Sequence, residues 1–251
     1  MGEVSEPAVA ALARVRVVLS HTTHPGNIGA AARALKTMGL HRLVLVDPKR
    51  FPDPQAEAMA VGADDLLAQA RVCPTLDDAL AGTTLAIALT ARRRDLSPLA
   101  VDAREAAELA IVEAHAGGEV AFVFGTEMAG LSNEDVLKCQ RVAYIVADPA
   151  FSSLNLAAAV QVVAHELRMA AAGRGTVAAE RTPPATFEEV EGLFAHLETS
   201  MVASGFLDPY SPRRLMERLR RLFGRARLES QEVNILRGML AAWDAAARRD
   251  K

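Results

Sequence analysis

The sequence predicts an α/β fold with an open parallel sheet, followed by a small helical extension. Two observations carry this prediction. Between residues 15 and 173, short runs that are apolar almost throughout alternate with helical patterns, and no strand pattern follows residue 173. Strands without polar alternation are typical of a parallel sheet that is covered on both faces. The regular alternation further predicts right-handed crossover connections.

The β-branched run at 15–20 predicts the first strand, and a helix is expected from Asn27 to Met38 with Gly39 suited to its C-terminal cap. Later apolar runs predict strands at 41–48, 71–75, 83–91, 119–125 and 141–147. Helical patterns lie at 56–70, with a break near Gly62, and at 76–82, 102–116, 133–139 and 155–173.

The chain changes character after residue 173, which predicts a domain boundary. Residues 1–173 are expected to form the α/β domain, and residues 174–185, which are small, polar and proline-bearing, read as a linker. Residues 186–251 predict an extension of three helices, whose first helix opens on a capping box formed by Thr186 and Glu189.

Composition limits the classes of function. The net charge of the 251-residue chain is −3, so any nucleic-acid site must be a local patch. Its two cysteines, Cys73 and Cys139, lack metal-ligand spacing, which predicts a reduced, cytoplasmic protein without a metal site. No uncharged apolar run is long enough for a membrane span, and the N-terminus has no secretory signal pattern.

Ligands in open α/β folds bind at the carboxyl ends of the strands, so the loops there are the candidate sites. The first is HPGNIGAAARALKTMG at 24–39. Asn27 can cap the helix, Arg33 should lean back toward the helix mouth, and the small neighbouring residues would leave space for a bulky ligand. The alternative is a solvated arginine on an ordinary helix.

Two further loops carry charge. Three consecutive arginines at 92–94 follow a predicted strand and suit phosphate contacts, although they could equally solubilise a loop. In FGTEMAGLSNED, Gly125 would allow close approach of a ligand, and Glu127 is the carboxylate of the loop. Ser132 can cap the next helix, so a joint without a ligand is the alternative.

The fourth loop, DPAFSSLNLAAAV, places Ser152, Ser153 and Asn155 at the start of a long alanine-rich helix. One of these residues would suffice as an N-cap. The presence of three indicates a further role.

In this order, three stretches resemble the motifs of the SPOUT RNA ribose 2'-O-methyltransferases of the SpoU class. These stretches are GNIGAAAR, FGTEMAGL and SSLNLAAAVQVVAHE, and the resemblance spans about residues 14–243. The C-terminal RLRRLFGRARLESQEVNILRGML is similar to the helical extension of the family's bacterial tRNA-modifying members. The resemblance implies a deep trefoil knot within about 120–173, a homodimer, and an active site built between its two subunits.

The resemblance also implies S-adenosylmethionine as cofactor, held largely by backbone groups of the knot loops. The matching positions are Leu89, Thr90, Ala91, Gly125, Ile145, Ser152, Ser153 and Leu154.

The implied reaction is methyl transfer to a ribose 2'-hydroxyl, centred on Arg33. Because guanidinium stays protonated in proteins, we expect Arg33 to grip the adjacent phosphate and stabilise the developing alkoxide. Substrate contacts are expected at Asn27, Arg92, Arg94, Glu127, Ser153, Asn155, Arg220 and Arg221.

The extension sharpens the expected substrate. Between Ser211 and Arg227 lie seven arginines and one glutamate, with Leu215, Leu219 and Leu222 as an apolar stripe. This excess of arginines predicts contacts with RNA phosphates, although a solvated surface helix is the alternative. By resemblance the substrate is tRNA, with cytidine or uridine methylated at nucleotide 32 of the anticodon loop.

Other functions stay open at this point. Ribosomal RNA could be the substrate instead. Thr126 stands where the tRNA-modifying members commonly carry arginine. This difference slightly favours a second alternative, a relative that binds RNA but is catalytically inactive. Asp47, about 20 residues after the glycine loop, would suit a NAD-dependent oxidoreductase, but the loop lacks the G-x-G-x-x-G pattern.

Overall fold

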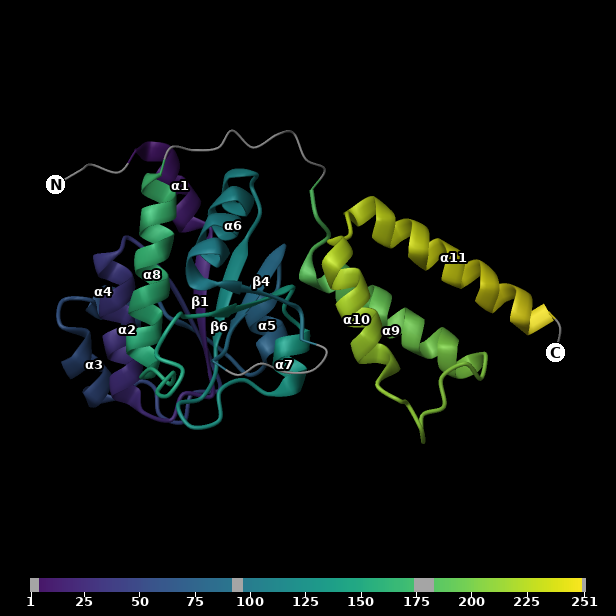
Figure 1. The fold of residues 1–251 in the computed structure, drawn as a ribbon, viewed down its shortest axis with the longest axis horizontal. Coiled ribbons are helices and arrows are strands. Elements are labelled where there is room, and N and C mark those ends of the chain that lie inside the picture. The colour runs from purple at the N-terminus through teal and green to yellow at the C-terminus, as the bar shows by residue number, and fades with distance from the viewer. Residues whose placement is uncertain (1–4, 92–96, 174–182, 250–251) are drawn as a thin grey trace.

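The computed structural model describes residues 5–91, 97–173 and 183–249. Figure 1 shows an α/β body and, beside it, an extension of helices. Most of the predicted linker, residues 174–182, lies outside the described residues, and so do Arg92 and Arg94. In the part of the chain that is described, no helix is both long and apolar enough to cross a membrane.

The predicted parallel sheet is confirmed. It has seven strands, all parallel, in the order β3-β2-β1-β6-β4-β7-β5. The strands are β1 (Val15–Ser20), β2 (Arg42–Val46), β3 (Arg71–Cys73), β4 (Leu85–Leu89), β5 (Leu99–Asp102), β6 (Val120–Phe124) and β7 (Arg141–Tyr144). The prediction missed β5, because this short edge strand forms only by pairing with β7 and its Leu99 is exposed.

The predicted helices of the body are present, and an additional helix, α1, precedes the first strand. They are α1 (Glu6–Ala13), α2 (Pro25–Thr37), α3 (Pro54–Ala60), α4 (Asp64–Ala68), α5 (Leu76–Leu80), α6 (Ala103–His115), α7 (Asn133–Leu137) and α8 (Leu156–Ala172). The expected break near Gly62 separates α3 from α4, with φ of +78° at this glycine.

Two apolar layers cover the sheet, which explains why its strands are apolar throughout. On one face Val17 and Leu19 of β1 pack with residues of α1, α2, α6 and α8. On the other face Val18 packs with residues of α5 and α7. Side chains of one strand therefore alternate between two buried layers.

The small residues of α2 serve helix packing. Ala31 and Ala32 are fully buried, at 0% exposed, where α2 packs against α3 and α8. A Cβ on Gly29 would lie 1.9 Å from the carbonyl oxygen of Ala56 in α3. The expectation that these residues leave space for a ligand is therefore wrong, because neighbouring helices fill that space.

The extension consists of α9 (Phe187–Ala203), α10 (Leu215–Ala226) and α11 (Ser230–Arg249), and the capping box of Thr186 and Glu189 is confirmed. Leu193 of α9 is buried with Val233 and Leu240 of α11. These contacts join the first and last helices of the extension into a parallel pair with its own small apolar core, and Figure 1 shows both helices running away from the body.

Helix α10 packs in a different way from the expected leucine stripe. Leu222 is 48% exposed, whereas the Phe223 ring contacts the Phe194 ring of α9 edge-on, with 6.1 Å between centroids. The guanidinium of Arg220 lies over the same Phe194 ring, 4.4 Å from its centroid. Leu215 and Leu219 are half-buried, as are Arg220 and Phe223, so the packed side of α10 includes Arg220 and Phe223 and leaves Leu222 outside it.

The junction between extension and body combines an apolar contact, in which Phe187 of α9 is buried in the same cluster as Leu80 and Val136, with several polar contacts. Arg227 Nη2 lies 3.0 Å from Glu113 Oε2, and the Glu113 side chain is only 5% exposed. The Thr84 hydroxyl donates to the other Glu113 oxygen at 2.6 Å, and Arg141 Nη1 donates to the Gly224 carbonyl at 3.3 Å. Burial and the nearby Arg227 lower the pKa of Arg141. Placement of the extension therefore depends in part on buried charge.

Candidate active site

A cavity opens where the loops after β4, β6 and β7 meet the start of α8. These strands are neighbours in the sheet, so their carboxyl ends lie at one edge. The cavity is lined by Leu89, Thr90, Ala91, Phe124, Gly125, Thr126, Glu127, Met128, Ala129, Gly130, Ile145, Ser152, Ser153, Leu154, Leu156 and Ala159. All of the positions expected for a cofactor lie on this one cavity, although they come from segments far apart in the sequence.

The loop after β6 folds back on itself, and this is why Gly125 is required. A Cβ on Gly125 would lie 2.1 Å from the carbonyl carbon of Gly130. Thr126 and Gly130 exchange two backbone hydrogen bonds of 3.2 and 3.0 Å, and Thr126 Oγ1 accepts from the amide of Ala129 at 3.1 Å. Gly125 therefore makes room for its own loop, and it also lines the cavity, so the close approach of a ligand there stays a prediction.

Glu127 ties this loop to the segment before α2. Its carboxylate accepts four hydrogen bonds: from Thr23 N at 3.1 Å, Thr23 Oγ1 at 2.8 Å, His24 N at 3.2 Å and Asn27 Nδ2 at 2.9 Å. Partial burial raises the pKa of Glu127, but the hydrogen bonds from Asn27 and Thr23 outweigh it and lower the pKa to about 2. Glu127 is therefore a carboxylate anion that holds two loops together.

Asn27 extends the same network to α8. Asn155 Nδ2 donates to Asn27 Oδ1 at 3.1 Å, while Asn155 Oδ1 caps α8 through the amides of Ala157 and Ala158. Asn27 does not cap α2, which begins at Pro25 with His24 as its N-cap. The expectation that Asn27 is the cap is wrong, because its side chain is engaged by Glu127 and Asn155 instead.

Sequence reasoning did not single out Thr23, which supplies two of the four hydrogen bonds to Glu127. The only sequence signal for Thr23 was its position shortly after the first strand.

The two serines of the fourth loop, Ser152 and Ser153, line the cavity, and Ser153 is the more exposed of the two.

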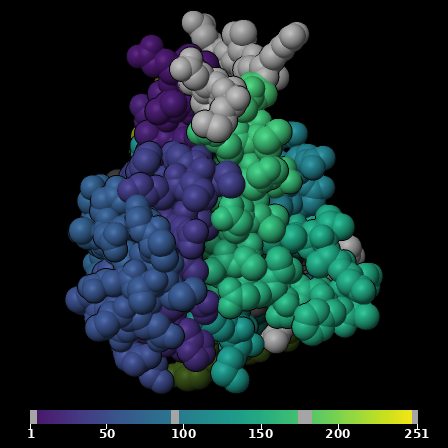
Figure 2. All heavy atoms as spheres, turned by 90° about the vertical axis from the view of Figure 1, so that its left-hand side faces the viewer, coloured from purple at the N-terminus to yellow at the C-terminus, as the bar shows by residue number. Residues whose placement is uncertain are grey.

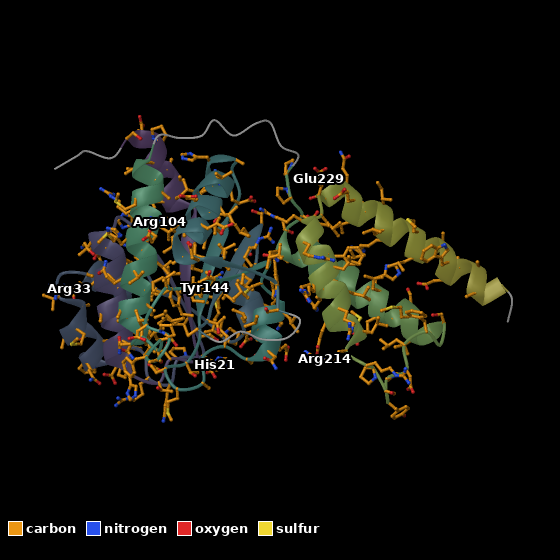
Figure 3. All side chains as sticks on the ribbon, in the orientation of Figure 1. His21, Arg33, Arg104, Tyr144, Arg214 and Glu229 are labelled. Carbon is orange, nitrogen blue, oxygen red and sulfur yellow. The ribbon has the colours of Figure 1, made fainter. Side chains whose placement is uncertain are left out.

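Arg33 lies elsewhere in the chain. Its side chain is exposed on α2, does not line the cavity, and extends outward from the body (Figure 3). It forms no hydrogen bond or ion pair with another residue of the described ranges. The expected lean toward the helix mouth does not bring Arg33 to the described cavity of its own chain.

The arginines predicted to contact RNA in the extension differ from each other. Arg220 forms an ion pair with Glu191, including a 2.7 Å bond from Nη2 to Oε2, and its side chain is 21% exposed. Arg221 is exposed. Arg220 is thus engaged in packing α10 against α9, and Arg221 faces solvent.

The cavity also bears on the oxidoreductase alternative. Asp47 follows β2, two strands away from β6, and does not line the cavity. Its side chain is 72% exposed and lies 3.8 Å from His21. A ribose-binding acid for a dinucleotide is therefore absent from the cavity as described.

Comparison with known proteins agrees with this geometry. Residues 14–165 match the SpoU rRNA Methylase family, and residues 188–251 match the C-terminal domain of the tRNA methyltransferase TrmJ.

The curated relatives are similar over almost their whole length. The tRNA (cytidine/uridine/adenosine-2'-O-)-methyltransferase TrmJ of Pseudomonas aeruginosa (strain UCBPP-PA14) is 49% identical, covering 94% of this chain and 96% of the relative. The tRNA (cytidine/uridine-2'-O-)-methyltransferase TrmJ of Escherichia coli (strain K12) is 46% identical, covering 96% and 99%. The crystal structure of TrmJ from Z. mobilis ZM4 superposes with a TM-score of 0.81 at 35% identity, covering 91% and 98%.

The parallel sheet, the cavity at its carboxyl edge and the matched residues define a methyltransferase of the SpoU class. The chain belongs to the SpoU rRNA Methylase family and, within it, to the TrmJ group of enzymes. Membership of a methyltransferase family also excludes the oxidoreductase alternative.

Proposed function

We propose that this chain is an S-adenosylmethionine-dependent tRNA 2'-O-methyltransferase that modifies cytidine or uridine at nucleotide 32 of the anticodon loop. The observation that carries the proposal is the convergence of the three motif loops on one cavity, tied together by Glu127, Asn27 and Asn155. Relatives that are 46–49% identical are named as tRNA 2'-O-methyltransferases. The trefoil knot at about 120–173 is part of the proposal.

The cavity residues fit the cofactor. Apolar side chains of Leu89, Ile145 and Leu154 can pack against an adenine ring, while the surrounding loops offer backbone groups for its polar edges. Among the lining residues that the structure describes, Glu127 is the charged one, and it is negative. This environment suits a cationic sulfonium, which supplies an activated methyl group when the cofactor is bound.

Arg33 is assigned to the transition state. A protonated guanidinium can bind the phosphate next to the target ribose and stabilise the alkoxide that develops at the 2'-oxygen. Holding this oxygen in line with the methyl group lowers the entropic part of the barrier. Glu127 is a poor candidate for the proton acceptor, because four hydrogen bonds already engage its carboxylate and its pKa is lowered to about 2.

Arg33 would reach the cavity of a partner subunit in a homodimer. Figure 2 shows α8 as a green band next to the purple and blue residues of α2 to α4. His165 and Met169 of α8 are exposed. A second copy that packs here would bring its own Arg33 close to the cavity of the first chain, and the site would be shared between subunits.

The extension is assigned to tRNA binding. Residues 188–251 match the TrmJ C-terminal domain, which favours tRNA over ribosomal RNA as the substrate. The exposed arginines of α10 supply positive charge that the chain as a whole lacks.

The test is methyl transfer from labelled S-adenosylmethionine to unmodified tRNA transcripts, followed by mapping of the methylated nucleotide. We expect label at nucleotide 32 and none in a transcript with 2'-deoxyribose at that position. Methylation of ribosomal RNA alone, or cofactor-independent RNA binding without any transfer, would contradict the proposal.

A further inference from the structure

The loop between α9 and α10 presents aromatic side chains to solvent. Tyr210 is 98% exposed and Phe206 is 71% exposed. Single exposed apolar residues are normal on protein surfaces, but two large rings within one short loop form an apolar tip. Figure 1 shows this loop projecting toward the same side of the molecule as the loops at the carboxyl edge of the sheet.

The loop has a defined conformation. Asp208 Oδ1 accepts from Tyr210 N at 2.9 Å, and the Asp208 carbonyl accepts from Ser211 N at 3.0 Å. Leu207 is buried and anchors the start of the loop through a 3.0 Å bond from its amide to the Met201 carbonyl. The ring of Tyr210 is therefore displayed by a fixed turn, which reduces the entropy that binding would cost.

The end of the loop holds an unfavourable backbone conformation. Arg213 and Arg214 have φ of +45° and +58°, a left-handed region that residues with a Cβ seldom adopt. Such conformations concentrate at sites of function, because the surrounding structure must enforce them. Here they turn the chain directly into α10, so that the aromatic tip is followed at once by positive charge.

A stripe of arginines runs from this loop along α10. Arg218, Arg221 and Arg225 are exposed, and their spacing of three and four residues puts them on one face of α10, while Arg214, the N-cap just before the helix, is also exposed. Arg220 and Arg227 point toward α9 and the body, where each has an acidic partner on another helix, whereas Arg214 pairs with Glu217 of α10 itself. The exposed stripe is therefore separate from the arginines that hold the helix in place.

We propose that the Tyr210 ring stacks on an unpaired base of the RNA substrate while the arginine stripe binds the neighbouring phosphates. This rests on the proposed function and names the part of the RNA that the extension recognises. Aromatic rings can stack only on bases that are free of a duplex, so the expected ligand is a single-stranded loop. The surrounding positive charge favours a polyanion over a protein partner.

The test compares RNA with and without an unpaired loop. Binding of unmodified tRNA to Tyr210→Ala should show a Kd raised about tenfold, equivalent to about 1.4 kcal/mol, whereas Tyr210→Phe should bind like the unmodified protein. Binding to a blunt RNA duplex of similar length should be unchanged in both variants. Trp243→Ala, which removes another exposed ring from α11, is the matched control and should leave the Kd unchanged.

Catalysis gives a second measurement. At saturating tRNA the kcat of Tyr210→Ala should equal that of the unmodified enzyme, with the loss confined to KM. Because Trp243 is the one tryptophan of the chain, a Tyr210→Trp, Trp243→Phe double variant places the sole indole at the loop. Its fluorescence should be quenched by tRNA and not by the duplex.

An unchanged Kd for tRNA in Tyr210→Ala, an equal loss of duplex binding, or quenching by both RNAs would each overturn the inference. These outcomes are distinct from failure of the proposed function, in which the unmodified chain itself would transfer no methyl group to tRNA.

Discussion

The catalytic loops and the helical extension are held in place by different means. In the α/β body, residues about a hundred positions apart are joined by short hydrogen bonds around Glu127, and small residues let backbones approach closely. In the extension, α10 is attached largely through ion pairs and through contacts of Arg220 and Phe223 with the Phe194 ring, and its remaining arginines are exposed. Chemistry requires fixed positions, whereas binding a flexible polyanion requires accessible charge.

This contrast predicts that one charge at the junction matters more for stability than several on the surface. Arg227→Met leaves the Glu113 carboxylate buried without its cation, with Thr84 as its remaining partner. We expect a loss of about 3–5 kcal/mol in the free energy of unfolding, measured by urea denaturation. Arg225→Met is the matched control, since Arg225 is exposed, and should change stability by less than about 0.5 kcal/mol.

A double variant sharpens this prediction. Glu113→Leu combined with Arg227→Met removes both charges and should recover most of the lost stability, because the penalty comes from the unpaired carboxylate. If the double variant is as unstable as Arg227→Met alone, the junction depends on packing of the arginine stem and not on its charge.

Arg33 tests the other side of the comparison, because it lies in the body yet is exposed. Arg33→Ala should lower kcat by about 10²–10³-fold with little change in stability, because the guanidinium is assigned to the transition state and makes no described contact within its own chain. Lys36→Ala, one turn further along α2, removes a cation paired with Asp65 and should leave kcat unchanged. Unchanged turnover in Arg33→Ala would refute the assignment.

Close packing in the body can be tested at α2. Gly29→Ala would force a Cβ to within 1.9 Å of the Ala56 carbonyl oxygen, so α2 and α3 must separate. We expect a loss of about 1–3 kcal/mol. Gly26→Ala lies in the same helix with its nearest atom at 3.4 Å, so thermal denaturation should show no loss of stability. If both variants change the stability equally, the change reflects helix propensity and not the close approach of α2 and α3.

These residues show how far the sequence could lead. The apolar runs of the sequence predicted the parallel sheet. The positions that the motif loops led us to expect for the cofactor all line the one cavity. The strand β5 and the helix α1 were missed. The reason for the small residues of α2 was also misread, because Gly29 and Ala31 are small for the sake of contacts with segments distant in sequence. Local patterns carry no information about such contacts.

The packed face of α10 was missed for a related reason. A leucine spacing of four and three residues predicts a buried stripe, but Leu222 is exposed, and Phe223 and Arg220 make the contacts with the Phe194 ring. The Phe194 ring and Glu191 of α9 select that face, and neither can be paired with α10 from the sequence. The knot and the homodimer stay predictions.

The smallest effect is expected for the charge of Glu127. Glu127→Gln keeps the size and an acceptor oxygen but loses the anion, which should cost about 1 kcal/mol or less because the group is partly in solvent. The folded pKa of about 2 lies below the usual 4.5, so this contribution is complete above about pH 4.5 and is lost as the pH falls toward 2. The stability difference between the two proteins should therefore be constant near neutral pH and shrink below pH 4.5.

The same variant tests whether Glu127 accepts the proton. Because Glu127 stays ionised throughout the neutral range, the pH profile of kcat should keep its shape in Glu127→Gln. Loss of an acid limb in that profile would instead make this carboxylate the proton acceptor.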